Sequence, residues 1–164
     1  SMRKTSLILN EGTLVDATLI HSSKQKKRKD ENGKTISNKA NDEDASYTSK
    51  RGRKHHGYKI HIATDTNSII KEVITTTAKT HDSTQFDTLT KDETKAVFAD
   101  SGYMSQERKR TLRSKGIFNG ITERRVRGQS KLRTKQSKNN TKFSKVRALV
   151  ELPFAFIKKL MKYT

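Results

Sequence analysis

The stretch KAVFADSGY, residues 95–103, decides how the rest of the sequence is interpreted. Four apolar residues lead to an acid, and a serine and a glycine follow at once. This pattern is typical of a short buried strand that turns at its C-terminal end. Ligands of open α/β sheets collect at the carboxyl ends of strands, so Asp100 is a candidate functional acid. The alternative is that Asp100 only caps the following helix or fixes a turn.

Composition favours a nucleic-acid partner. The 164 residues are enough for about one domain, and 36 Lys and Arg against 17 Asp and Glu give a formal charge of +19. Such a charge repels itself and favours binding to a polyanion. The sequence has no cysteine and no apolar run near the ~18 residues of a membrane span. We therefore expect a cytoplasmic, nucleoid-associated protein without membrane contact.

A second acid lies within a predicted strand. Residues 13–20 (TLVDATLI) are rich in β-branched side chains, yet Asp16 stands in their middle. Aspartate is disfavoured in strands. Asp16 is therefore paired with a cation, placed at a sheet edge, or kept there to bind a metal.

Between these acids the pattern predicts a hairpin. Residues 58–64 and 69–76 alternate in polarity, and Asp65 opens the turn between them. Three histidines, at positions 55, 56 and 61, have strand spacing and no cysteine beside them, which argues for a packing or basic role rather than zinc binding.

Two helices and a strand are predicted around residues 95–103. Asp82, followed three residues later by Gln85, has the capping-box pattern of a helix start. Residues 105–115 are a basic helix that ends before Gly116, and residues 117–121 are a short strand.

Two basic stretches have no hydrophobic period. Residues 22–54 and 124–142 are rich in Lys, Arg, Asn and Ser, which predicts long flexible loops. They are either solvated linkers or contacts to DNA phosphates. We predict DNA contacts from the run that includes Lys26, Lys27 and Arg28.

The C-terminal helix is the clearest periodic element. Apolar residues between 143 and 161 fall on one helical face, while Arg147, Glu151 and Lys158 share the opposite one. For an isolated helix, Arg147 and Glu151 would be an ordinary surface pair worth a few tenths of a kcal/mol. Pro153 predicts a kink just past Glu151.

The order of these elements predicts one α/β domain over residues 1–164 with a ribonuclease H-like fold, in which helices flank a mixed five-stranded sheet. In that layout two strand acids and one helix acid meet at one edge. Three close carboxylates raise each other's pKa unless a cation neutralises them. Oxygen ligands favour Mg²⁺ or Mn²⁺, and two ions about 3.5–4 Å apart can clamp a phosphodiester.

Four motifs together resemble the bacterial insertion-sequence transposases of the DDE type, over nearly the whole chain. They are VDAT (15–18), HGYKIH (56–61), ADSGY (99–103) and the spaced set Arg147, Glu151 and Lys158. The resemblance implies that Asp16, Asp100 and Glu151 are the catalytic, metal-binding triad. It also implies that Arg147 and Lys158 hold DNA phosphates, and we add Lys59 of the second motif as a DNA contact.

The chain departs from the family pattern in two respects. Ser144 stands where the last motif of the family has a tyrosine. The N-terminal DNA-binding region and C-terminal extension of such transposases are expected to be missing.

Two classes of function remain open at this stage. The first is a metal-dependent transposase that cuts transposon ends and joins the 3′-hydroxyl to target DNA, as a homo-oligomer when bound to DNA. The second is a non-catalytic basic DNA-binding remnant. A nuclease of the same fold is a third possibility, and only the acid triad separates the enzymes from the binding module.

Overall fold

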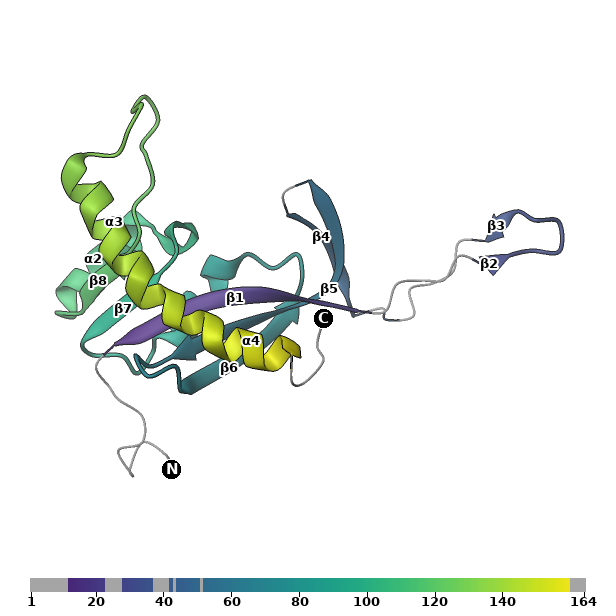
Figure 1. Ribbon diagram of the computed structural model, residues 1–164, viewed down its shortest axis with the longest axis horizontal. Helices are drawn as coiled ribbons and strands as arrows, with labels where there is room; N and C mark the ends of the chain where they lie inside the picture. Colours follow the sequence, from purple (N-terminus) through teal and green to yellow (C-terminus); the bar gives the residue numbers. More distant parts are fainter. Residues whose placement is uncertain (1–11, 23–27, 37–41, 43, 51, 160–164) are drawn as a thin grey trace.

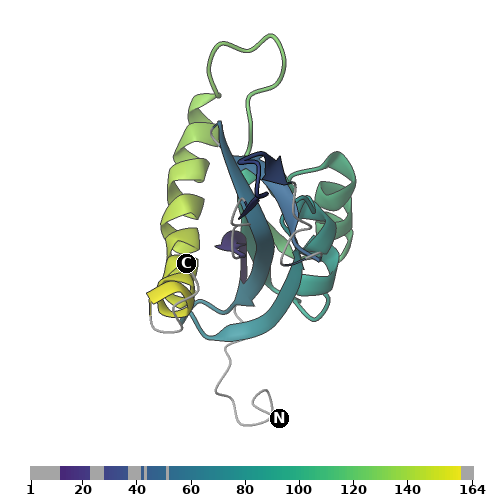
Figure 2. The ribbon, with the colours of Figure 1, turned by 90° about the vertical axis from the view of Figure 1, so that its right-hand side faces the viewer.

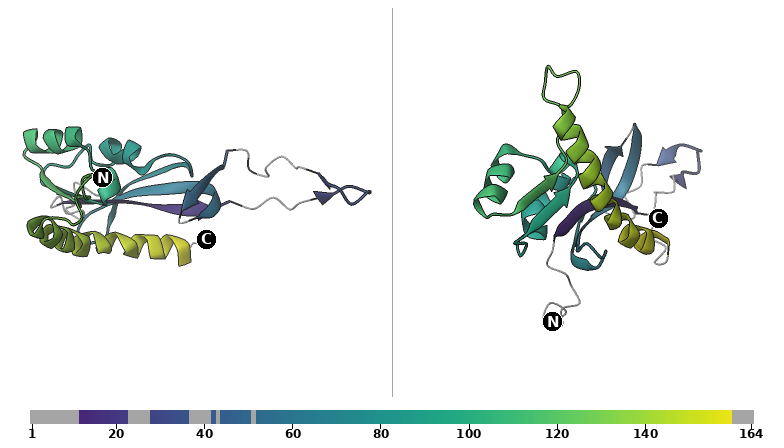
Figure 3. Two further views of the ribbon diagram at one scale, coloured as in Figure 1. Left: turned by 90° about the horizontal axis from the view of Figure 1, so that it is seen from above. Right: turned by 60° about the vertical axis from the view of Figure 1, so that its left-hand side comes forward.

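The computed structural model describes residues 12–22, 28–36, 42, 44–50 and 52–159. It contains one mixed sheet with helices on both faces, as Figures 1 and 3 show. The strands of this sheet are β1 (Thr13–His21), β4 (Ser46–Lys50), β5 (Arg53–Thr64), β6 (Ile70–Thr77), β7 (Ala96–Ala99) and β8 (Phe118–Ile121). A separate hairpin consists of β2 (Arg28–Lys29) and β3 (Thr35–Ile36).

Two groups of helices cover the sheet. One face carries η1 (Asp82–Gln85), α1 (Phe86–Leu89) and α2 (Gln106–Ser114), and the other carries α3 (Thr134–Arg147), η3 (Ala148–Val150) and α4 (Glu151–Lys159). A short turn of helix, η2 (Ser101–Tyr103), follows β7 directly. Figure 2 shows the rod of α3 and α4 lying along one side of the sheet.

The strand order confirms the ribonuclease H-like α/β fold. Strand β6 pairs with β5, and the order continues through β1, β7 and β8. The first three of these strands are antiparallel, whereas β7 and β8 run parallel to β1. The predicted count of five strands was wrong by one, because residues 46–50 form β4 against the first residues of β5.

The register of β1 and β7 places the two strand acids side by side. Thr13, Leu14 and Val15 pair with Val97, Phe98 and Ala99. The next position on each strand is Asp16 and Asp100. Leu14 and Phe98 pack toward α3 and α4, and residues two apart in a strand share a face. Both acids therefore lie on the face that these helices cover.

A buried carboxylate links the two strands beside this register. Glu93 is 5% exposed, and its Oε2 accepts hydrogen bonds from Thr13 Oγ1 (2.5 Å) and Lys71 Nζ (3.1 Å). Its Oε1 accepts from the backbone N–H groups of Thr94 (2.9 Å), Lys95 (2.7 Å) and Ala96 (3.3 Å). Glu93 therefore ties the start of β1 to the start of β7.

The apolar side chains divide between the two faces. Below α1 and α2 the core includes Val15, Ala63, Phe86, Leu89, Val97, Ala99, Tyr103, Leu112, Ile117 and Ile121. Below α3 and α4, Leu14 and Ile62 pack against Val150, with Phe98 and Val146 beside them. Since successive residues of a strand face opposite sides, this division also directs Asp16 and Asp100 toward the second face.

Both predicted loops contain regular secondary structure. Residues 22–54 contain β2, β3 and β4 and the first residues of β5, so they are not one structureless loop. Residues 124–142 are a loop only to Arg133, where α3 begins. The first part of α3 has no apolar stripe to reveal it. Its side chains Gln136 and Asn140 instead hydrogen-bond Glu123, the carboxylate of which accepts from Gln136 Nε2 at 2.5 Å.

The helix break lies before Glu151, not past it as predicted. Residues Ala148–Val150 form a turn of 3₁₀ helix between α3 and α4. A proline disturbs the carbonyl four residues earlier, which for Pro153 is that of Leu149. The freed Leu149 carbonyl accepts a hydrogen bond from Ser68 Oγ at 2.9 Å. The turn that joins β5 to β6 therefore anchors the break.

Three predictions about single residues are confirmed. Asp65 shapes the hairpin turn by accepting from the N–H groups of Asn67 (2.9 Å) and Ile69 (2.8 Å). Gly116 ends α2 with a left-handed φ of 68°. The buried His61 contacts Thr76 Oγ1 through Nε2 at 2.8 Å, which is the packing role that its position suggests.

Candidate active site

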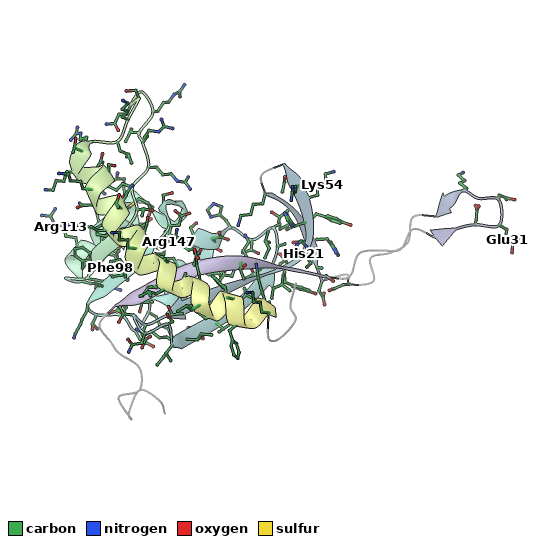
Figure 4. All side chains as sticks on the ribbon, viewed as in Figure 1. His21, Glu31, Lys54, Phe98, Arg113 and Arg147 are labelled. Atoms are coloured by element: carbon green, nitrogen blue, oxygen red, sulfur yellow. The ribbon has the colours of Figure 1, made fainter. Side chains whose placement is uncertain are left out.

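Asp16 and Arg147 form the centre of the site. The Arg147 Nη1 donates to Asp16 Oδ2 at 2.7 Å, and the side chains are 26% and 23% exposed. The backbone N–H of Ala17 donates to the other oxygen, Oδ1, at 2.8 Å. Figure 4 shows Arg147 on α3 where the rod of helices crosses the sheet. Asp16 is therefore paired with a cation, one of the alternatives left open by the sequence.

The pKa of the Asp16 carboxyl is raised above its ordinary value. Burial is the largest cause, and the nearby charges of Asp100 and Asp82 raise the pKa further. The Ala17 N–H and the Arg147 guanidinium oppose these effects without cancelling them. Burial therefore makes the charged form of Asp16 unfavourable, and a cation bound beside the carboxylate would stabilise that form.

Asp100 is exposed at the carboxyl end of β7. Its Oδ1 accepts from the N–H of Ser101 (2.6 Å) and lies 3.4 Å from Thr122 Oγ1. Asp100 thus caps η2, as the alternative interpretation held. The cap engages one oxygen, so capping does not exclude a second role for the carboxylate.

Glu151 is the first residue of α4 and is exposed. It stands four residues after Arg147, beyond the break in the helix. Among the residues that the structure describes, no three His, Asp or Glu side chains are close enough to hold a metal ion. The structure brings Asp16 and Asp100 together and leaves Glu151 outside a closed triad.

Asp82 adds an acid to the site that the sequence interpretation treated only as a helix cap. The cap of η1 is His81, the ring of which accepts from the N–H of Ser83. Asp82 instead forms an ion pair with Lys59 at 2.7 Å. Its charge also raises the pKa of Asp16 and, together with burial, that of Tyr103. The sequence cue was weak, because the pair joins η1 to a strand more than twenty residues away.

The predicted DNA contacts have different surroundings. The ammonium of Lys59 is held by Asp82 and by the Thr80 carbonyl at 2.5 Å, and its side chain is 14% exposed. Lys59 therefore supports η1 rather than facing a ligand. Lys158 lies half-buried on α4, and Arg28 is the first residue of β2. Lys26 and Lys27 fall outside the described residues.

Fold and site together define a class of protein. Paired carboxylates on the central strands of a ribonuclease H-like sheet, beside an arginine, are suited to chemistry on phosphodiesters. Residues 9–164 match the family model described as a transposase DDE domain, so the chain belongs to that family. No solved structure matches the chain. No helix in the described part of the chain is long and apolar enough to cross a membrane.

Proposed function

We propose that this chain is a metal-dependent polynucleotidyl transferase. It hydrolyses a phosphodiester at each transposon end and joins the freed 3′-hydroxyl to target DNA. The observation that carries the proposal is the adjacent placement of Asp16 and Asp100 on one face of the sheet, with Arg147 bound to Asp16. DNA is the proposed partner, the place of action is the nucleoid, and a homo-oligomer is proposed for the DNA-bound state.

The residues present fit one or two Mg²⁺ or Mn²⁺ ions. Asp16 and Asp100 offer hard carboxylate oxygens, and a bound cation would offset the burial that is the main cause of the raised pKa of Asp16. Glu151 would complete the ligand set. Bound ions would lower the pKa of an attacking water or hydroxyl and neutralise charge on the phosphate.

The protein groups contribute position and charge. Asp16 and Asp100 are held by strand register, so the distance between their backbones is set before any ligand arrives. Arg147 has a planar guanidinium suited to phosphate oxygens, and it can exchange Asp16 for a phosphate when DNA enters. Asp82 is restrained by its ion pair with Lys59, and its negative charge acts on Asp16.

One observation favours a second candidate, a non-catalytic DNA-binding module. Within the described residues the acids do not form a three-ligand group, and Arg147 occupies one oxygen of Asp16. If that arrangement persists with DNA bound, the chain binds without cutting. The high positive charge supports either function equally.

The test is a cleavage and joining assay with labelled duplexes that carry the terminal sequences of the element. We expect Mg²⁺-dependent release of a 3′-hydroxyl end and joining of that end to a target plasmid, with neither in EDTA. Cleavage without joining would assign a nuclease instead. Binding with no cleavage in Mg²⁺ or Mn²⁺ would assign the binding module.

A further inference from the structure

A cavity of about 530 Å³ opens beside Asp100. Its wall includes Ser101 and Gly102, the two residues after Asp100, and Arg124 and Arg125 from the loop between β8 and α3. A neighbouring cavity of about 720 Å³ shares both arginines and reaches Lys131. We call the two together the basic hollow. The loop that bounds it rises above the sheet in Figures 1 and 2.

Arg124 is held against the backbone that follows Asp100. Its Nε donates to Ser101 Oγ at 3.0 Å. Its Nη2 would lie 3.4 Å from a Cβ on Gly102, so the guanidinium also lies close to this residue. Arg124 therefore remains exposed while the hydrogen bond to Ser101 directs its side chain along this backbone. A pre-positioned, solvent-facing guanidinium is a ready anion ligand.

The charge of the basic hollow is not neutralised internally. Lys109 and His81 line the first cavity along with the arginines. The one acid in its wall is Glu123, which is engaged by Gln136 and by an ion pair with Lys109 at 3.7 Å. Arg125 donates to the Ser130 carbonyl at 3.0 Å. Within the described part of the chain, neither Arg124 nor Arg125 has an ion pair with a carboxylate.

The lining also indicates which part of a nucleic acid fits. No Phe, Tyr or Trp is among the residues that line either cavity. Stacked bases usually need such rings, whereas phosphates need cations and N–H donors. The basic hollow is therefore built for a sugar-phosphate backbone rather than for bases.

We propose that the basic hollow binds the backbone of the DNA strand next to the scissile phosphate, with Arg124 and Arg125 on its phosphates. The location beside the scissile bond rests on the proposed function of Asp100. Arg124 would then be a positioning residue, because it fixes the strand relative to the acids without contacting the reacting atoms.

Two measurements in EDTA test this proposal. The first is fluorescence anisotropy of a labelled 30-base-pair duplex across 50–200 mM salt. Each phosphate contact adds about −0.9 to the slope of log K against log salt, so Arg124→Gln should make the slope shallower by about that amount. Over this range the wild type should then lose about threefold more affinity than the variant. Arg127→Gln, in the same loop but outside the hollow, is the matched control and should keep the wild-type slope.

The second measurement is arginine modification by phenylglyoxal, located by mass spectrometry. Saturating duplex should protect Arg124 and Arg125 and leave Arg127 reactive. Equal protection of all three, or an unchanged slope in Arg124→Gln, would overturn the proposal. Neither readout depends on cleavage, so inactive protein with Arg124 protected would count against the transposase reaction and not against the binding site.

Discussion

The strand acids and the helix acid of the site are positioned by different means. Asp16 and Asp100 occupy neighbouring positions on paired strands, and the hydrogen-bonded ladder between β1 and β7 sets their separation. Glu151 begins a helix that follows a break, and its placement depends on how α4 leaves η3. The ladder consists of regular backbone hydrogen bonds, whereas the break is held by the buried Val150 and by the bond from Ser68 to the Leu149 carbonyl. The strand part of the site is therefore set by sheet register, and the helix part by the geometry of the break between α3 and α4.

The largest expected effect is the loss of DNA cleavage when any one of the three proposed metal-binding acids is replaced. Asp16→Asn, Asp100→Asn and Glu151→Gln should each reduce Mg²⁺-dependent cleavage of transposon-end DNA by roughly 10³-fold or more. Even groups that only support a metal ligand account for about 10–100-fold. The assay measures initial rates at saturating Mg²⁺. Near-wild-type cleavage by one variant would remove that residue from the triad.

Glu107→Gln is the matched control for the helix acid. Like Glu151, Glu107 is an exposed glutamate in the first turn of a helix, but it lies on α2. Its cleavage rate should equal that of the wild type. The free energy of unfolding of both glutamine variants should lie within about 0.5 kcal/mol of the wild-type value, as is usual for surface substitutions.

The pairing of β1 with β7 should be destabilised when the Glu93 carboxylate, which we call the clamp, is removed. Glu93→Gln takes the carboxylate charge from the buried pair with Lys71 and weakens the link between Thr13 and β7. Breaking a buried ion pair costs about 3–5 kcal/mol, so the midpoint of thermal unfolding should fall by roughly 10 °C. Circular dichroism measures the midpoint. A fall of less than about 2 °C would mean that strand pairing alone holds the register.

The same clamp should depend on pH. Burial raises the pKa of Glu93, but hydrogen bonds from Thr13, Lys95 and Lys71 and the charge of Lys71 outweigh it, and the net pKa is lowered from 4.5. An acid with a lowered folded pKa stabilises the protein above its unfolded pKa and loses that contribution as pH falls through the folded value. The stability gap between the wild type and Glu93→Gln should be full above pH 4.5 and shrink below it. A gap that is constant from pH 7 to pH 3 would contradict this assignment.

The sequence predicted those features that depend on local pattern. The alternation around Asp65, the apolar run before Asp100 and the glycine that ends α2 each leave a signal within a few residues. The clamp by Glu93 leaves none, because its partner Thr13 is 80 residues away. The start of α3 was missed since its stabilising contacts are polar and come from Glu123. For Glu151 the helix and the effect of the proline could be predicted locally, but the anchor of the break, Ser68, lies in a distant turn.

Removing the Ser68 hydrogen bond should have a smaller effect, and this effect concerns the placement of α4. Ser68→Ala removes the hydrogen bond to the Leu149 carbonyl and should lower the free energy of unfolding by about 1 kcal/mol. It should also weaken Mn²⁺ binding, because α4 and Glu151 become less restrained. Urea unfolding and isothermal titration calorimetry measure the two effects.

Ser68→Gly separates the hydrogen bond from backbone strain. Ser68 has a positive φ of 65°, which glycine adopts without cost. The glycine variant should therefore lose less stability than the alanine variant but show the same weakening of Mn²⁺ binding. If only the alanine variant binds Mn²⁺ less well, strain at Ser68, and not its hydroxyl, positions α4.

The smallest expected effect tests the contact that joins the strand part and the helix part of the site. Arg147, on the helix side, holds an oxygen of Asp16 on the strand side and so competes with any cation for that oxygen. Both side chains are about a quarter exposed, and such pairs contribute about 0.2–1 kcal/mol. Arg147→Gln should therefore bind Mn²⁺ about 1.4- to fivefold more tightly than the wild type when DNA is absent, as measured by calorimetry. Lys145→Gln, which removes an exposed charge two residues earlier on α3, should bind Mn²⁺ like the wild type. Weaker Mn²⁺ binding by Arg147→Gln would show that the arginine holds Asp16 in place for the metal and does not compete with it.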